Sequence, residues 1–153
     1  GLLNESLKAL NAIEPMRASE PSQRWRAHYD LMHAQVLAYR VRLFQFLLAL
    51  DKHQKEKPMP KGMNNRWNLV RVPEMLALDE AQAKITKTDL NELNAQLEKA
   101  KGEFAEVVKN HPRTPWARRA ATEMRAGYGI KFVDTFRDPR YDTVGKDIKL
   151  PNG

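Results

Sequence analysis

The sequence predicts an all-α fold: an antiparallel helical bundle of about four helices, with one long central helix and a short extended C-terminal tail. Three observations support this prediction. Apolar residues recur at helical spacing between residues 25 and 50, a second helical pattern spans residues 90–107, and helix start and stop signals separate the two. The chain of 153 residues, 42% of them hydrophobic and 29% charged, is long enough to bury a core.

The first two helices follow from leucine spacing and from prolines. Leucines three and four residues apart predict a short helix over about residues 3–13, which Pro15 would end. Ser19 with Pro21 is a typical helix start, and the long helix that follows is expected to end before Pro58.

The long helix carries apolar residues on two faces. Alternating steps of four and three residues place one stripe on a single face: Trp25, Tyr29, Met32, Val36, Tyr39, Leu43, Phe46 and Leu50. A second stripe lies nearly opposite: Leu37, Val41, Phe44 and Leu48. Such a helix needs cover from two directions, so we expect it at the centre of the bundle, with Trp25 in the core. If its short neighbours leave one stripe exposed, homo-oligomerisation is an alternative.

A third helix is predicted by a stripe with the same spacing: Leu90, Leu93, Leu97, Ala100, Phe104 and Val107. Thr86 or Thr88 is the expected cap, with Asp89 in the first turn, and Pro112 lies beyond the end. A fourth helix begins at Thr114 with Pro115 in its first turn and is closed by Gly127. The third and fourth helices are expected to form an antiparallel hairpin.

Two further segments are expected to be extended. One covers residues 68–72, and the other begins at Ile130, where apolar and polar residues alternate. We therefore expect a helical domain over residues 1–130 and an extended segment with a tail over residues 131–153. We expect the whole to be one domain of a larger protein.

The spacing of Ala100, Phe104, Val107 and Pro112 resembles the second half of a tetratricopeptide repeat, and the segment from Thr114 to Ala117 resembles the entry to the next helix. The first half of the repeat departs from the pattern, with Lys84, Lys87, Thr88 and Asn91 at its positions. The chain is thus similar to helical domains appended to larger bacterial proteins, among them proteins with a von Willebrand factor type A module. This resemblance implies a scaffold that holds other proteins or domains, and no catalytic residues.

The net charge of +7 is unevenly distributed along the chain. Basic residues dominate residues 52–71 and 109–140, and the segment between them is acidic. This asymmetry favours an acidic partner surface or a polyanion, although solubility and helix-end charges explain it equally well. No apolar run is long enough to span a bilayer, and cytoplasmic and extracytoplasmic locations in a bacterium both remain open.

Residues for catalysis or metal binding are scarce. The chain has no cysteine and no glycine-rich phosphate loop. His28, Asp30 and His33 face different directions on a helix, so we interpret them as polar residues on its exposed part. His53 and His111 are expected to interact with helix C-termini. We therefore predict a protein that is not an enzyme and has no cofactor and no metal.

We predict a non-catalytic protein-interaction or scaffold module, with a protein or a neighbouring domain as its partner. The alternative is a basic polyanion- or nucleic-acid-binding helical domain. Trp116 is expected in the core. The predicted partner-binding surface combines the loop around Trp67 with the arginines near the start of the fourth helix: Trp67, Arg66, Arg71, Arg113, Arg118, Arg119 and Arg125.

Overall fold

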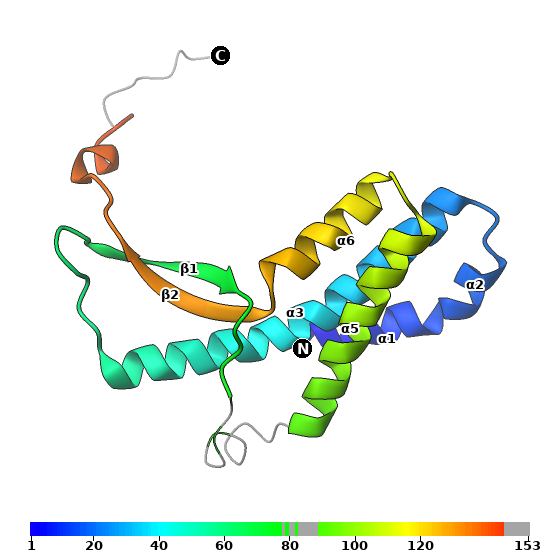
Figure 1. Cartoon of the computed structure of the whole chain (residues 1–153), viewed down its shortest axis with the longest axis horizontal. Helices are drawn as coiled ribbons and strands as arrows, with labels where there is room; N and C mark the ends of the chain where they lie inside the picture. Colours follow the sequence, from blue (N-terminus) through cyan, green and yellow to red (C-terminus); the bar gives the residue numbers. More distant parts are fainter. Residues whose placement is uncertain (78, 80–81, 83–88, 146–153) are drawn as a thin grey trace.

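A computed structural model describes residues 1–77, 79, 82 and 89–145 of the chain. The expected caps Thr86 and Thr88 and the last residues of the predicted C-terminal tail lie outside the described residues. The described part is mostly helical, as predicted, but it also contains a two-stranded antiparallel sheet that the all-α prediction omitted. Helix α3 runs along the molecule, and the other elements pack along its length (Figure 1).

The N-terminal third forms three helices, α1 (Leu2–Ala12), α2 (Glu14–Ser19) and α3 (Gln23–Glu56). The sequence predicted α1 and α3 but not α2, whose first turn holds the proline that was expected only to end α1. Helix α3 is capped by Ser22, which accepts a hydrogen bond from the Trp25 N–H at 3.4 Å. It therefore begins a few residues later than expected and extends for about 50 Å at about 1.5 Å per residue.

The next two helices are α5 (Leu90–Asn110) and α6 (Pro115–Ala126). Asp89 caps α5 by accepting hydrogen bonds from two backbone N–H groups. Thr114 caps α6 as predicted, and Gly127 follows its last residue. Helix α6 turns back along α5, and both pack against α3 (Figure 1).

The two segments expected to be extended pair with each other as β1 (Arg66–Val72) and β2 (Gly129–Thr135). They run antiparallel, with Leu69 opposite Phe132. The boundary predicted between residues 130 and 131 lies inside β2. The ribbon packs on the C-terminal half of α3, where the ring of His53 lies 4.7 Å from that of Trp67 and 4.6 Å from that of Phe132. A single turn of 3-10 helix, η1 (Pro139–Asp142), follows the ribbon.

Two glycines allow the chain after α6 to pass close to the end of β1. Gly127 has a φ of 76°, and a Cβ atom there would lie 2.4 Å from the Val72 carbonyl oxygen. A Cβ atom on Gly129 would lie 1.7 Å from the Glu74 carbonyl oxygen. Real atoms do not approach so closely, so both positions require glycine for this crossing.

The core lies between α3 and the α5–α6 pair. Ala34 and Ala38 of α3 are fully buried, which lets α5 approach closely, and Phe104 of α5 is also fully buried. The buried cluster comprises Leu31, Ala34, Leu37, Ala38, Val41, Leu93, Leu97, Ala100, Phe104, Val107, Ala120 and Tyr128. Trp116 packs against this cluster, as predicted. No helix in the described ranges is both long and apolar enough to cross a membrane.

Candidate functional site

The first apolar stripe of α3 is largely uncovered, contrary to the expectation that both faces are buried. Trp25, which was expected in the core, is 61% exposed, and Leu43 is 48% exposed. We call this stripe the α3 seam: Trp25, Tyr29, Met32, Val36, Tyr39, Leu43, Phe46 and Leu50. None of the eight residues is buried. The neighbouring helices pack instead on the opposite face, which carries Leu37 and Val41.

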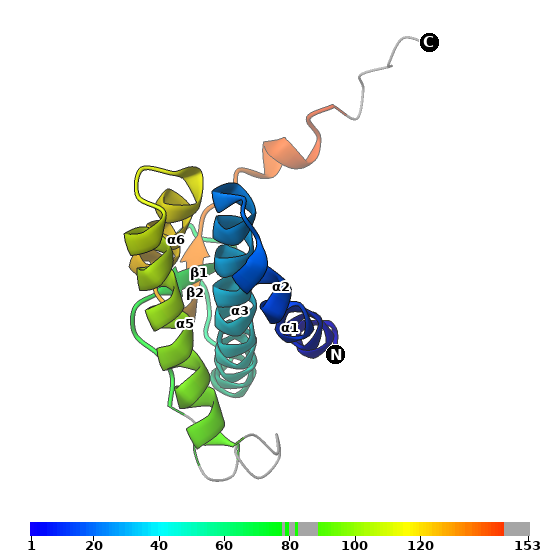
Figure 2. The same cartoon turned by 90° about the vertical axis from the view of Figure 1, so that its right-hand side faces the viewer.

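The length of the neighbours explains why the seam is open. Helix α1 has 11 residues and α3 has 34, so α1 can cover only part of one side. It is attached near Tyr29, whose hydroxyl donates a hydrogen bond to the Leu10 carbonyl oxygen at 2.9 Å. Figure 2 shows α1 on one side of α3, and α5 and α6 on the other.

Helix α6 reaches the seam near its middle. The guanidinium carbon of Arg42 lies 4.6 Å from the centre of the Tyr39 ring, a cation–π distance. The Arg119 guanidinium lies 2.7 Å from Glu123, and the charge of Glu123, together with an interaction with the Tyr39 side chain, raises the pKa of Arg119 above its ordinary value. The middle of the seam is therefore bordered by arginine side chains.

An apolar groove opens at the N-terminal end of the seam, with a volume of about 430 Å³. The end of α1, the start of α2 and the first turns of α3 supply its apolar lining: Leu10, Ile13, Met16, Trp25, Tyr29 and Met32. Glu20 also lines the groove, but its carboxylate already accepts the Ser22 N–H at 2.8 Å. The groove therefore offers mainly apolar surface to a bound group.

The cation cluster beside the seam is centred on one buried acid. Glu123 of α6 is fully buried and accepts hydrogen bonds from Arg42 of α3 at 2.8 Å and from Arg71 of β1 at 2.9 Å. Its second oxygen lies 2.7 Å from Arg119. Burial raises the pKa of Glu123, but the charges of Arg42, Arg71 and Arg119 outweigh it and hold the pKa below its ordinary value. Three cations around one anion leave an excess of positive charge.

Two of the predicted partner-binding residues, Arg71 and Arg119, belong to this cluster. Arg71 also donates to the backbone carbonyl of Gly127 at 2.9 Å, so it links β1 to the end of α6. Arg119 is half exposed and pairs with the buried acid. Both side chains therefore pair with groups of this chain. The sequence did not single out Glu123, because a lone acid between Thr122 and Met124 on a helix gives no local signal of burial.

The remaining predicted residues lie at two separate places. Arg66 and Trp67 are at the far end of the ribbon, where Arg66 donates to the Asn68 side chain at 2.6 Å. Trp67 is half-buried and contacts His53. The exposed arginines of the start and outer face of α6 lie beyond the other end of the ribbon: Arg113, Arg118 and Arg125. The ribbon and α6 each span about 20 Å, so the structure does not bring these two groups together.

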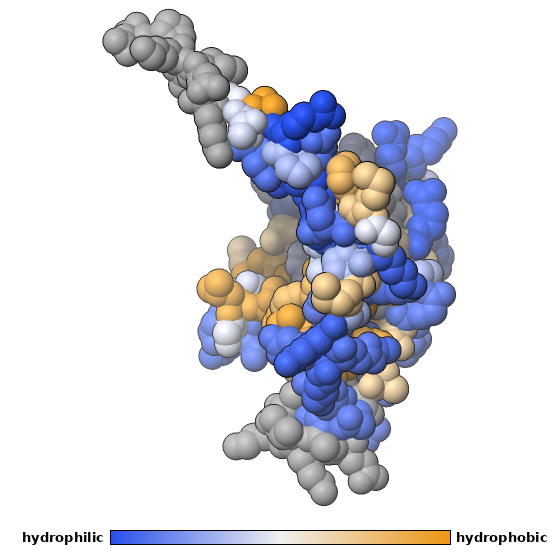
Figure 3. Space-filling model, turned by 90° about the vertical axis from the view of Figure 1, so that its left-hand side faces the viewer, coloured by the Kyte–Doolittle hydropathy of each residue, from blue (hydrophilic) through white to orange (hydrophobic). Residues whose placement is uncertain are grey.

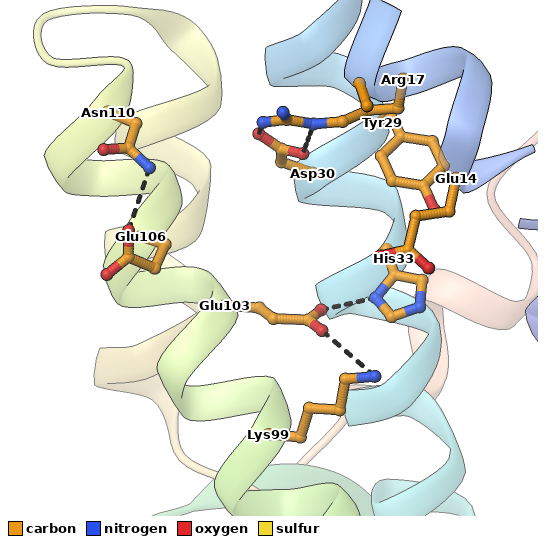
Figure 4. A pocket seen from close by; sticks show the side chains of 10 residues that line it. Glu14, Arg17, Tyr29, Asp30, His33, Lys99, Glu103, Glu106 and Asn110 are labelled. Carbon is orange, nitrogen blue, oxygen red and sulfur yellow. Dashed lines mark hydrogen bonds and ion pairs between the residues drawn. The ribbon is translucent and has the colours of Figure 1, made fainter. Parts of the chain in front are cut away.

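A polar cavity of about 400 Å³ lies between α2, α3 and α5 (Figure 4). Arg17 of α2 forms a two-point pair with Asp30 of α3 at 2.7 and 2.6 Å. Burial raises the pKa of Asp30, but hydrogen bonds from Arg17 and His111 outweigh it, so the pKa lies below its ordinary value. The expectation that Asp30 is an exposed surface residue is therefore wrong.

The histidines of this region are also more enclosed than expected. His33 is buried, with Nδ1 2.6 Å from Glu103 and Nε2 2.9 Å from Asn11. His111 is buried too, and its Nε2 lies 3.1 Å from Asp30. Both ring nitrogens of His33 are engaged, which leaves neither available to a substrate. These pairs attach α1, α2 and α5 to α3. Within the described ranges, no three histidines or acids are placed to hold a metal ion.

A second apolar cavity, of about 440 Å³, lies between the ribbon and the C-terminal end of α3. Trp67, Phe132 and His53 line it. The His53 ring meets the Trp67 ring edge to face and the Phe132 ring at a tilt, and these contacts hold the ribbon on α3, so we assign the cavity a structural role.

Hydrophobic residues also gather visibly on the outside of the molecule. Figure 3, which views the molecule from the ribbon end, shows them on one side at mid-height, next to strongly hydrophilic residues. Exposed apolar patches of this kind on soluble proteins are typical of sites that bind another molecule.

Comparison of this chain with models of protein families, with curated proteins and with solved structures found no significant match.

Proposed function

We propose that this chain is a non-catalytic protein-interaction module, and that the α3 seam is the surface that holds its partner. One observation carries the proposal: eight apolar or aromatic residues stand in line on a single rigid helix, and none of them is buried. A folded protein gains stability by burying such residues, so a surface that retains them is suited to binding.

The spacing of the seam supports a helical partner. Its alternating steps of four and three residues repeat every seven residues, as in one strand of a coiled coil. Such a seam presents apolar side chains to a second helix along its full length. The groove beside Trp25 adds a pocket for a large apolar side chain at one end.

The cavities support a binding role over a catalytic one. Arg17 pairs with Asp30 and Lys99 pairs with Glu103 around the polar cavity, and both ring nitrogens of His33 are hydrogen-bonded. We further propose that α5 and α6 form a tetratricopeptide-like scaffold. The burial of Ala100, Phe104 and Val107 in the core supports this part of the proposal.

The test is capture of proteins from native cells with the chain as bait, in ~0.3 M salt so that loose charge contacts are screened. The wild-type chain is compared with a Leu43→Gln, Leu47→Gln double variant and with Met63→Gln as control. Leu47 borders the seam and is 44% exposed, whereas Met63 lies in the loop before the ribbon and is 80% exposed.

We expect the wild-type chain and the Met63→Gln control to retain the same protein, and the double variant to lose it. Equal retention by all three chains, or no retained protein at all, overturns it.

A further inference from the structure

From the charge around the α3 seam we infer that its partner is an acidic amphipathic α-helix of another protein, laid along the seam between α1 and α6. This inference rests on the proposed function and specifies the chemistry of the partner. It follows from the period of the seam, from the groove at its end and from the charges at its borders.

The dimensions fit one partner helix. From Trp25 to Leu50 the seam is about 38 Å long at about 1.5 Å per residue, the length of a helix of about 25 residues. Helix α1 borders it through Tyr29, and α6 borders it through Arg119, so the partner helix has a wall on either side over part of its length.

The borders of the seam are basic. In a coiled coil, the residues beside the apolar seam decide which partner pairs with it. The charged residues at those positions of α3 are Arg26, Arg40 and Arg42, and no acid occupies them. Within the chain, Arg40 lies 3.6 Å from the exposed Glu92 of α5, and Arg42 pairs with the buried Glu123. The Nε atom of Arg26 is buried and has no hydrogen-bond partner among the described residues. Arg119 and the excess positive charge around Glu123 add to the same border.

The same charges disfavour a second copy of this chain. Two antiparallel copies of the seam in full overlap would place Arg26, Arg40 and Arg42 opposite alanine, glutamine and histidine, and no acid at the border positions could pair with them. A partner with glutamate or aspartate beside its own apolar stripe would meet arginines on both sides. Charge complementarity therefore selects a different, acidic helix over self-association.

The inference is tested with two designed peptides of about 25 residues, which share leucines at the seven-residue repeat. One carries glutamate beside the leucines and the other carries lysine, so neither pairs readily with itself. Binding of each labelled peptide to the purified chain is measured by fluorescence anisotropy. We expect the glutamate peptide to bind at least about tenfold more tightly than the lysine peptide.

Variants of the chain make the test specific. Leu43→Gln should weaken binding of the glutamate peptide by about five- to tenfold, because a half-exposed leucine is lost from the contact. Met63→Gln should leave the affinity for this peptide unchanged. An Arg26→Glu, Arg40→Glu variant should reverse the preference in favour of the lysine peptide. A purely structural role for these arginines would not produce that reversal.

Three results overturn the inference: equal binding of both peptides, no binding of either, or a dimer in sedimentation that Leu43→Gln converts to a monomer. The failures are distinguishable. If capture from cells depends on the seam but neither peptide binds, the proposed function stands and the acidic-helix inference falls. If capture does not depend on the seam, the proposed function falls as well.

Discussion

Replacing Glu123 with alanine should destabilise the fold more than any change of an exposed acid. The Glu123 side chain is 1% exposed and pairs with Arg42, Arg71 and Arg119 from three different elements. Removing one member of a buried ion pair typically costs about 3–5 kcal/mol, because the remaining charge is left without a partner.

Where the loss of unfolding free energy falls between about 3 and 5 kcal/mol depends on how exposed each of the three arginines is. The Arg42 side chain is 12% exposed and would lose the one acidic partner that the described residues give it, whereas the Arg119 side chain is 54% exposed and would be solvated. Arg71 keeps the backbone carbonyl oxygens of residues 123 and 127 as acceptors, each at 2.9 Å. We therefore expect a loss of about 3 kcal/mol, a large share of the 5–15 kcal/mol that stabilises a typical domain.

The assay is urea unfolding followed by far-ultraviolet circular dichroism, with Glu98→Ala as the control. The Glu98 side chain is 70% exposed on α5, so this change should alter the free energy of unfolding by less than about 0.5 kcal/mol. Arg119→Ala should cost less, about 1 kcal/mol, because the Arg119 side chain is 54% exposed and Glu123 keeps Arg42 and Arg71 as partners. A loss below about 1 kcal/mol for Glu123→Ala would refute the view that this carboxylate joins α3, α6 and β1.

Three other changes test the account. The pKa values of Asp30 and Glu123 lie below their ordinary values of 3.8 and 4.5. The stability that these carboxylates provide is therefore present above pH 4.5 and is lost as the pH falls through their lowered pKa values in the folded protein. Urea unfolding measured from about pH 7 to about pH 3 would show this loss. Gly129→Ala should cost about 1–3 kcal/mol in the same assay, because its Cβ would overlap a backbone carbonyl oxygen. Arg118→Glu with Arg125→Glu should leave partner capture in ~0.3 M salt unchanged, whereas a polyanion-binding function predicts its loss.

Local signals in the sequence predicted most of the helices. Thr114 caps α6, and Gly127 follows its last residue, because capping and left-handed backbone depend on residue type and immediate neighbours. The pairing of β1 with β2 was not predicted, since the two strands are about 60 residues apart and no local feature specifies which segments will meet. Helix α2 was missed because Pro15 fits both the end of one helix and the first turn of another.

The candidate site was predictable only in part. The periodicity of α3 revealed two apolar faces, but which face the neighbours cover depends on the length and placement of α1, α5 and α6. Trp25 is therefore exposed although it lies on an apolar stripe. The burial of Glu123 depends on arginines from α3 and β1 that only the tertiary fold brings together, so Arg71 could not be distinguished from a free surface arginine by sequence.

The most direct test of the α3 seam is site-specific photo-crosslinking in native cells. A photoreactive phenylalanine derivative replaces Leu43 in one chain and Tyr141 in another, and cross-linked products are identified by mass spectrometry. Tyr141 is 67% exposed and lies in η1, away from the seam. The account predicts a cross-link to a helical, acidic segment of a different protein from position 43 and not from position 141. Cross-links to that protein from position 141 alone, or from position 43 only to a second copy of the chain, would contradict it.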